Sequence, residues 1–183
     1  MPRMPLKLFT IPIVLLAGAC STTYPNRNPV GEPFPDAIGS TLEKKTVELP
    51  TAYEGEPALY MVGYIQDTQF DLDRWTIGLV QTEFPCRIVE VPTIPGAIPS
   101  MMQGTIDDGM RKGIPSEDWG NVVTLYGSAA KPVAEFTGTQ NPRNGRMLLL
   151  DADGTVRWFW DQGFSAKRLM ELNTTAKSLI KPD

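Results

Sequence analysis

Apolar residues occur in short runs between residues 42 and 183, and the spacing of these runs predicts a fold of alternating strands and helices. Residues 58–64 form a nearly continuous apolar run, which is typical of a strand buried on both faces. Shorter runs predict further strands at 46–49, 87–91, 122–125, 147–150 and 155–159. Between the last two, Asp-Ala-Asp-Gly predicts a hairpin turn in which Gly154 has a positive φ.

Three segments show the spacing of an amphipathic helix, with apolar positions every three or four residues. They cover residues 71–82, 99–112 and 165–180. The positions that mark their apolar faces are Leu72, Trp75 and Leu79; Met102, Ile106 and Met110; and Leu169, Leu172, Ala176 and Leu179. Strands that alternate with helices and end in a hairpin predict an α/β sandwich with a central mixed sheet flanked by helices.

The first 20 residues have a different pattern. Arg3 and Lys7 precede or flank an apolar run from Leu8 to Ala17, which is too short to span a membrane but suits a secretory signal peptide. The run ends in Ala-Gly-Ala-Cys, which resembles the lipobox of bacterial lipoproteins, although Leu is usual where Ala17 stands. The resemblance implies a lipoprotein signal peptide at residues 1–19 and lipidation of Cys20. An ordinary signal peptide followed by a chance Cys is the alternative.

The lipobox resemblance also implies a location. Ser21 follows the Cys, so the Asp retention signal of Gram-negative lipoproteins is absent, which favours the outer membrane with the domain facing the periplasm. The net charge is −4, so basic residues would not hold the protein on an anionic surface. We therefore expect membrane attachment through palmitate and other acyl chains, since several chains anchor stably where one does not.

Residues 20–41 lack hydrophobic periodicity, and Pro residues recur through them. We expect the lipidated Cys and a flexible tether at 20–41, followed by one folded domain at 42–183. Stretched at about 3.3 Å per residue, such a tether would hold the domain some tens of ångströms from the bilayer. The apolar residues Val30, Phe34 and Ile38 indicate that part of the segment packs on the domain.

The amino-acid composition excludes several kinds of catalytic and metal-binding site. The chain has no His and only two Cys, which excludes His-dependent catalytic triads, His metal sites and a Cys-x-x-Cys redox pair. The acidic balance argues against a nucleic-acid partner. No phosphate-binding Gly-rich motif is present. We therefore expect no catalytic, cofactor-binding or metal-binding residue, and no cofactor.

Residues 145–158 and 163–165 carry a family resemblance. Gly-Arg-Met-Leu-Leu-Leu-Asp-Ala-Asp-Gly-Thr-Val-Arg-Trp, followed by Gly-Phe-Ser and the last helix, resembles the end of the thioredoxin-like mitochondrial ATP synthase assembly factors. The middle of the chain, from residue 90 through residues 110–115, also fits that family, and the likeness covers roughly residues 42–180. The resemblance implies a thioredoxin-like domain. In redox members the thiols lie at the start of the first long helix, but residues 66–71 contain no Cys.

Cys86 is the one thiol left if Cys20 is lipidated. A small buried side chain is the first interpretation of Cys86, and the alternative is a single-Cys redox centre whose pKa is lowered by Arg87. Three functions follow: a non-catalytic lipoprotein that binds or helps assemble envelope proteins, a thiol-dependent oxidoreductase using Cys86, and a structural envelope lipoprotein. The first is preferred because the sequence offers no catalytic motif.

Overall fold

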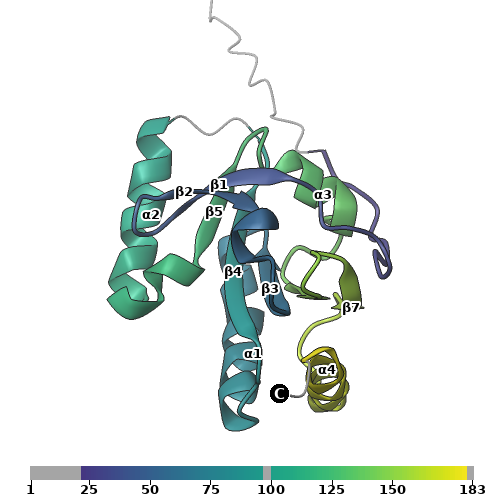
Figure 1. Ribbon diagram of the computed structural model, residues 1–183. Helices are drawn as coiled ribbons and strands as arrows, with labels where there is room; N and C mark the ends of the chain where they lie inside the picture. Colours follow the sequence, from purple (N-terminus) through teal and green to yellow (C-terminus); the bar gives the residue numbers. More distant parts are fainter. Residues whose placement is uncertain (1–21, 97–99, 181–183) are drawn as a thin grey trace, which may run out of the picture.

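The apolar runs of the sequence meet in a seven-stranded sheet, the centre of the computed structural model (Figure 1). The structure describes residues 22–96 and 100–180, so the signal peptide at 1–19 and Cys20 lie outside the described residues. The strands are β1 (Ala37–Thr41), β2 (Thr46–Leu49), β3 (Ala58–Gly63), β4 (Arg87–Ile94), β5 (Val123–Tyr126), β6 (Arg146–Leu150) and β7 (Val156–Trp160).

The sheet has the order β2-β1-β5-β4-β3-β6-β7. β4 pairs in parallel with both β3 and β5, whereas the other neighbouring strands are antiparallel. The predicted mixed sheet is therefore confirmed. Every residue of β3 is buried, as its continuous apolar run predicts for a central strand.

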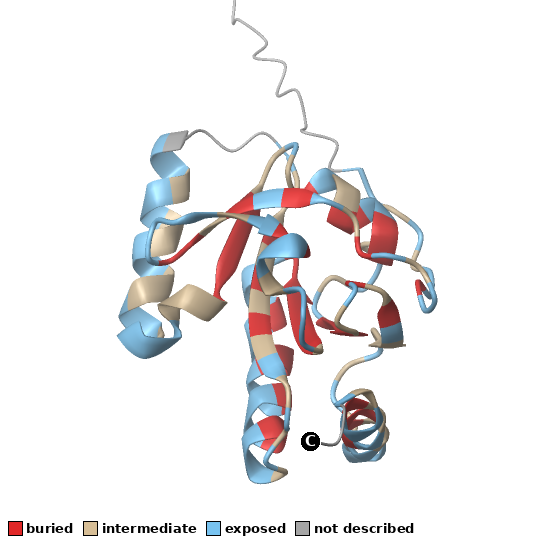
Figure 2. Cartoon of the chain, in the orientation of Figure 1, coloured by how far each residue is buried: buried red, intermediate tan, exposed pale blue. Residues whose placement is uncertain are grey.

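Helices cover both faces of the sheet: α1 (Gln69–Gln81), α2 (Ser100–Gly113), α3 (Lys131–Thr137) and α4 (Ala166–Leu179). α1 and α4 pack on one face, where Trp75 and Leu172 are fully buried with Leu59 of β3. The other face packs against α3 and the chain before β1, with Phe34 in contact with Tyr60 at 5.0 Å between ring centroids. Figure 2 shows this burial concentrated in the central strands and the inner helix faces.

The expected flexible tether at 20–41 is corrected by the structure from Tyr24 onward. β1 is an internal strand between β2 and β5, and Phe34 is only 3% exposed in the core. The chain before β1 pairs with the edge strand β7: Gly31 N donates to Val156 O (2.8 Å), and Val156 N donates to Glu32 O (3.0 Å). An extended, Pro-rich chain suits a sheet edge, because half of its backbone groups need no partner there. The folded domain therefore begins well before residue 42.

α2 differs from the other helices because none of its described side chains is buried. The expected apolar stripe is present, but Met102 is 53% exposed. Polar contacts tie α2 to the sheet instead. Arg111 Nε donates to Leu42 O (2.7 Å), and Tyr126 Oη donates to Asp107 Oδ1 (2.8 Å). Among the described helices, none is long and apolar enough to cross a membrane.

Candidate functional site

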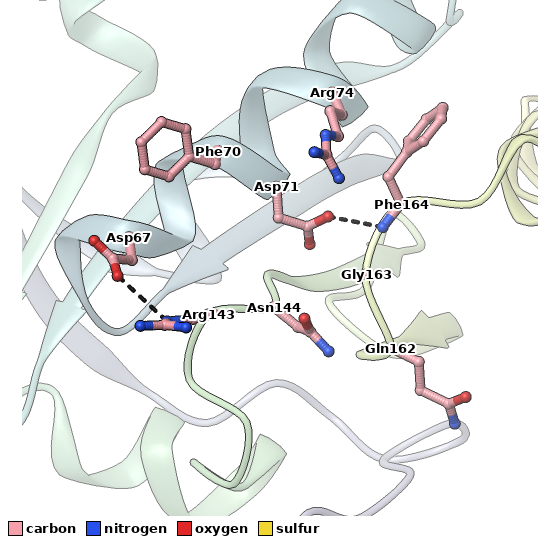
Figure 3. Close-up of a pocket in the computed structure, with 9 residues that line it drawn as sticks. All are labelled: Asp67, Phe70, Asp71, Arg74, Arg143, Asn144, Gln162, Gly163 and Phe164. Atoms are coloured by element: carbon pink, nitrogen blue, oxygen red, sulfur yellow. Dashed lines mark hydrogen bonds and ion pairs between the residues drawn. The ribbon is translucent and has the colours of Figure 1, made fainter.

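A cleft of about 600 Å³ opens at the start of α1, in the size range of ligand pockets (Figure 3). Three segments form its walls: the first turns of α1 with the turn before them, the loop before β6, and the loop between β7 and α4. The lining residues are Asp67, Phe70, Asp71, Arg74, Arg143, Asn144, Gln162, Gly163 and Phe164. The cleft lies beyond the carboxyl end of β3, where ligands of open α/β sheets commonly bind.

Asp71 joins the three walls. Its carboxylate is buried, and Oδ2 accepts a hydrogen bond from Gly145 N (2.9 Å) while Oδ1 accepts one from Phe164 N (2.7 Å). A Cβ at position 145 would lie 2.5 Å from Leu72 Cδ2, so only Gly145 lets the loop approach α1 this closely. Both carboxylate oxygens are thus used to shape the cleft.

Arg146 fixes the second wall of the cleft, which is the loop before β6. Its side chain is fully buried, and its guanidinium donates to the carbonyl oxygens of Gly138 (3.3 Å), Gln140 (2.5 Å) and Asn144 (2.6 Å). The guanidinium also lies 5.4 Å from the ring centroid of Tyr64. Burial lowers the pKa of Arg146, yet the group remains a cation, because guanidinium keeps its proton in proteins. The loop that carries Arg143 and Asn144 is therefore held in one conformation.

The third wall of the cleft, the loop between β7 and α4, is fixed by hydrogen bonds from nearby side chains. Asn144 Nδ2 donates to Asp161 O (3.1 Å), and Trp160 Nε1 donates to Gly163 O (2.6 Å). Gly163 has φ +80°, a conformation that side chains other than Gly's resist. Together with the bond from Phe164 to Asp71, these contacts leave the loop preorganised rather than adaptable.

Aromatic and cationic side chains are exposed at the mouth of the cleft, although Phe164 also packs edge-on against Trp75 at 5.4 Å between ring centroids. Phe70 is 70% exposed and Phe164 is 36% exposed, although burial would be favourable for both rings. Arg143 pairs with Asp67 at 3.3 Å in an exposed ion pair. Arg74 takes part in none of the ion pairs of the described residues. Aromatic rings beside guanidinium groups are typical of surfaces that bind polypeptides.

The residues that were expected to matter for chemistry lie elsewhere. Cys20 is outside the described residues. Cys86 is half-buried just before β4, and Arg87 at the start of β4 pairs with Ala58 at the start of β3, so the thiol lies at the opposite end of the sheet from the cleft. Burial raises the pKa of Cys86 to about 11.

The alternative interpretation, in which Arg87 lowers the pKa of Cys86, is not supported by the contacts of Arg87. Arg87 Nη1 donates to Asn121 Oδ1 (2.9 Å), and its guanidinium lies 5.5 Å from the ring centroid of Tyr53. Among residues 22–96 and 100–180, no group of three or more His, Cys, Asp or Glu side chains is placed to hold a metal ion. The turn at 66–70 opens onto the cleft, and none of the nine lining residues is a Cys.

Sequence reasoning singled out residues 66–71 as the place where redox members carry their thiols, but it assigned no role to the lining residues, which come from three distant segments. One signal was available: Phe70 lies off the apolar face formed by Leu72, Trp75 and Leu79, so an amphipathic helix must expose it. An aromatic residue on the solvated face of a helix is a candidate contact residue.

Comparisons with known proteins show the fold. The chain is similar to a Sco family protein, "a member of the Sco family of cytochrome c oxidase assembly proteins", with a TM-score of 0.57 at 14% identity, covering 85% of this chain and 99% of that one. It is also similar to a SCO1/SenC family lipoprotein from Bacillus anthracis (TM-score 0.53, 14% identity, 85% and 99% covered). A third is the thioredoxin domain of a thiol-disulfide oxidoreductase from Bacteroides vulgatus (TM-score 0.51, 19% identity, 84% and 100% covered).

No protein-family model matches the sequence, and a search of the curated proteins found no match. At these identities the likeness shows the fold alone. The predicted thioredoxin-like sandwich is confirmed, because these neighbours cover most of the chain and share its mixed sheet flanked by helices. Resemblance to the ATP synthase assembly factors and lipidation of Cys20 stay predictions.

Proposed function

We propose that this thioredoxin-like chain is a membrane-anchored, non-catalytic lipoprotein that binds envelope polypeptides, or assists their assembly, through the cleft at the start of α1. One observation carries the proposal: the cleft has fixed walls, exposed aromatic and cationic side chains, and no thiol among its lining residues. A thioredoxin-like domain with a shaped cleft and no nucleophile in it retains the means to bind a polypeptide but not to exchange its disulfides.

The anchor rests on Ala-Gly-Ala-Cys at residues 17–20, and the proposed location is the outer membrane, facing the periplasm. An envelope location agrees with the neighbours, since two of them are described as lipoproteins: the SCO1/SenC protein and the "pneumoccocal exposed lipoprotein thioredoxin" of Streptococcus pneumoniae (TM-score 0.51, 14% identity, 76% and 98% covered).

A thiol-dependent oxidoreductase is the second candidate, because several neighbours are described as thiol enzymes or assembly proteins with redox switches. For this chain such a reaction would depend on Cys86. A thiol with a pKa of about 11 is almost entirely protonated at neutral pH and attacks disulfides slowly. A structural envelope lipoprotein without a specific client is the third candidate, and the fixed cleft argues against it.

Affinity capture from solubilised outer membranes tests the proposal. Arg74→Glu reverses a charge in the cleft, and Lys177→Glu makes the same reversal on an exposed residue near the end of α4. We expect the wild-type chain and Lys177→Glu to recover the same envelope polypeptides. Arg74→Glu should recover them at least tenfold less. Equal recovery by both variants would overturn the assignment of the cleft, and no specific polypeptide with the wild-type chain would favour the structural lipoprotein.

A further inference from the structure

The first described residues of the chain already form hydrogen bonds to the folded domain. We call residues 22–36 the N-terminal strap. Tyr24 N donates to Thr139 Oγ1 (2.9 Å), and Thr139 N donates back to Tyr24 O (2.9 Å). A Cβ on Gly138 would lie 2.3 Å from Asn26 Cα, so the strap lies directly on the loop that follows α3. From Tyr24, four residues after Cys20, the strap is therefore part of the domain surface.

The strap is bonded to two walls of the cleft. Asn26 Nδ2 donates to Asp161 Oδ2 (2.7 Å), and Asp161 immediately precedes the lining residue Gln162. Asn26 Oδ1 accepts from Arg146 Nη2 (3.3 Å), the same guanidinium that holds the loop of Arg143. One side chain of the strap thus touches the supports of both loops, and the chain enters the domain at the end where the cleft opens.

The remaining tether is short compared with the domain. Six residue steps separate Cys20 from Asn26, which reach at most roughly 21 Å when fully stretched. A folded domain of this size is roughly 40 Å across. If Cys20 carries a lipid, the end of the domain opposite the cleft can approach the bilayer only when the strap is released from Thr139 and Asp161.

We propose that the strap turns the cleft toward the bilayer, so that the cleft binds a polypeptide segment lying at the membrane surface, in another anchored or membrane-spanning protein. This rests on the proposed function, because it requires lipidation of Cys20. The exposed side chains of the cleft suit that place, because Phe and Arg occur together on protein surfaces that lie at the level of the lipid headgroups. Phe70 and Arg74 are the residues that would meet such a segment.

The test measures which end of α1 lies near the lipid. Gln66 and Gln81 are two exposed residues at opposite ends of this region, and the helical rise places them roughly 20 Å apart. The lipidated protein, with Cys86→Ala, receives a fluorophore at Gln66→Cys or Gln81→Cys and is placed in vesicles with nitroxide-labelled headgroups. We expect at least twofold stronger quenching at Gln66→Cys. Twenty Gly and Ser residues inserted after Thr22 should remove the difference.

The outcomes separate the orientation from the function. Equal quenching at both positions in protein that floats with the vesicles would overturn the orientation, while the anchor and the capture of clients would still stand. Protein that stays in solution and takes up no labelled palmitate would overturn the lipidation of Cys20 and the orientation with it. Cys20→Ser is the control for attachment, and it should leave both fluorophores unquenched.

Discussion

Most charged and polar groups around the cleft are used to hold the fold together. Asp71 accepts two backbone hydrogen bonds, Arg146 donates to several carbonyl groups, and the hydroxyl of Tyr64 lies 2.6 Å from Thr137 Oγ1. Burial raises the pKa of Tyr64 to about 12, so the phenol keeps its proton at every physiological pH. These bonds hold the walls of the cleft in place, although Arg146 Nε is buried without a hydrogen-bond partner among the described residues.

Cys86→Ala tests the role of the remaining thiol. Because burial raises the pKa of Cys86 to about 11, its thiolate is scarce near neutral pH. Loss of this small half-buried side chain should cost about 1 kcal/mol of unfolding free energy. We expect reduction of insulin disulfides and consumption of peroxide at background rates with the wild-type chain. Fast turnover by the wild-type chain that disappears in Cys86→Ala would contradict a non-catalytic function and favour a thiol-dependent oxidoreductase.

Glu90 should make the protein less stable as pH rises. Burial, with a contribution from Asp73, raises the pKa of Glu90 from 4.5 to about 7. Between these values the folded state binds the extra proton, so the unfolding free energy falls as pH increases through this window. Glu90→Gln removes the charge, and we expect the variant to be more stable than the wild type at pH 8 by about 1–3 kcal/mol.

Urea unfolding at pH 5 and pH 8 measures this effect. The difference between Glu90→Gln and the wild type should shrink at pH 5, where the native carboxyl is already protonated. Glu48→Gln, on an exposed position of β2, is the matched control and should follow the wild type at both pH values. A wild-type pH dependence that persists unchanged in Glu90→Gln would show that Glu90 titrates normally.

Elements depend on a few backbone positions, and the hairpin between β6 and β7 is the clearest case. Gly154 has φ +76°, and Asp151 Oδ1 accepts from the backbone N–H groups of Asp153 (3.0 Å) and Thr155 (2.9 Å). Partial burial raises the pKa of Asp151, but these bonds and one from Arg157 outweigh it and hold the pKa below its usual value. The turn predicted from the sequence is confirmed.

Gly154→Val should destabilise the domain by about 2 kcal/mol or more, because a β-branched residue resists positive φ. A Cβ there would also lie 2.8 Å from Pro50 Cγ, which adds a steric conflict. Gly104→Val is the comparison, since Gly104 lies in α2 with open space around its Cβ position. In thermal unfolding, Gly154→Val should have a clearly lower melting temperature than Gly104→Val. Equal melting temperatures would contradict the turn.

Sequence patterns predicted most of the elements, including the four-residue strand β2, but missed β1 and α3. β3 and the buried face of α1 follow from periodicity, because burial on a sheet demands it. β1 was missed because Gly39 interrupts it, and the structure gives the reason: a Cβ there would lie 2.6 Å from Val123 Cγ1. α3 was missed because it has only seven residues, with Pro132 in its first turn. The cleft was missed because tertiary contacts assemble it.

At the scale of the whole molecule, the N-terminal chain connects regions that are distant in sequence. β1 joins β2 to β5, and the strap pairs with Val156 at the start of the edge strand β7. This pairing occupies backbone groups at the start of β7 that would otherwise be open to another strand. The same strap carries the chain to the cleft, so the stability of the sheet and the placement of the site depend on one segment.

A truncated chain that begins at residue 42 should therefore fail to fold cooperatively. It lacks β1, which leaves β2 without its neighbour in the sheet, and it lacks Phe34 in the core. A chain that begins at Thr23 keeps both and should melt like a chain that begins at residue 20. Circular dichroism during heating compares them. A cooperative transition at the same temperature in both chains would mean that residues 23–41 are dispensable.

In-cell photo-crosslinking from α1 tests most directly whether the cleft binds a polypeptide. A photoreactive amino acid replaces Phe70 in the cleft or Val80 at the far end of the same helix, two positions that are each 70% exposed. The proposed function predicts a discrete adduct with an envelope protein from position 70 and none from position 80. Adducts of equal yield from both positions, or no adduct from position 70, would contradict it.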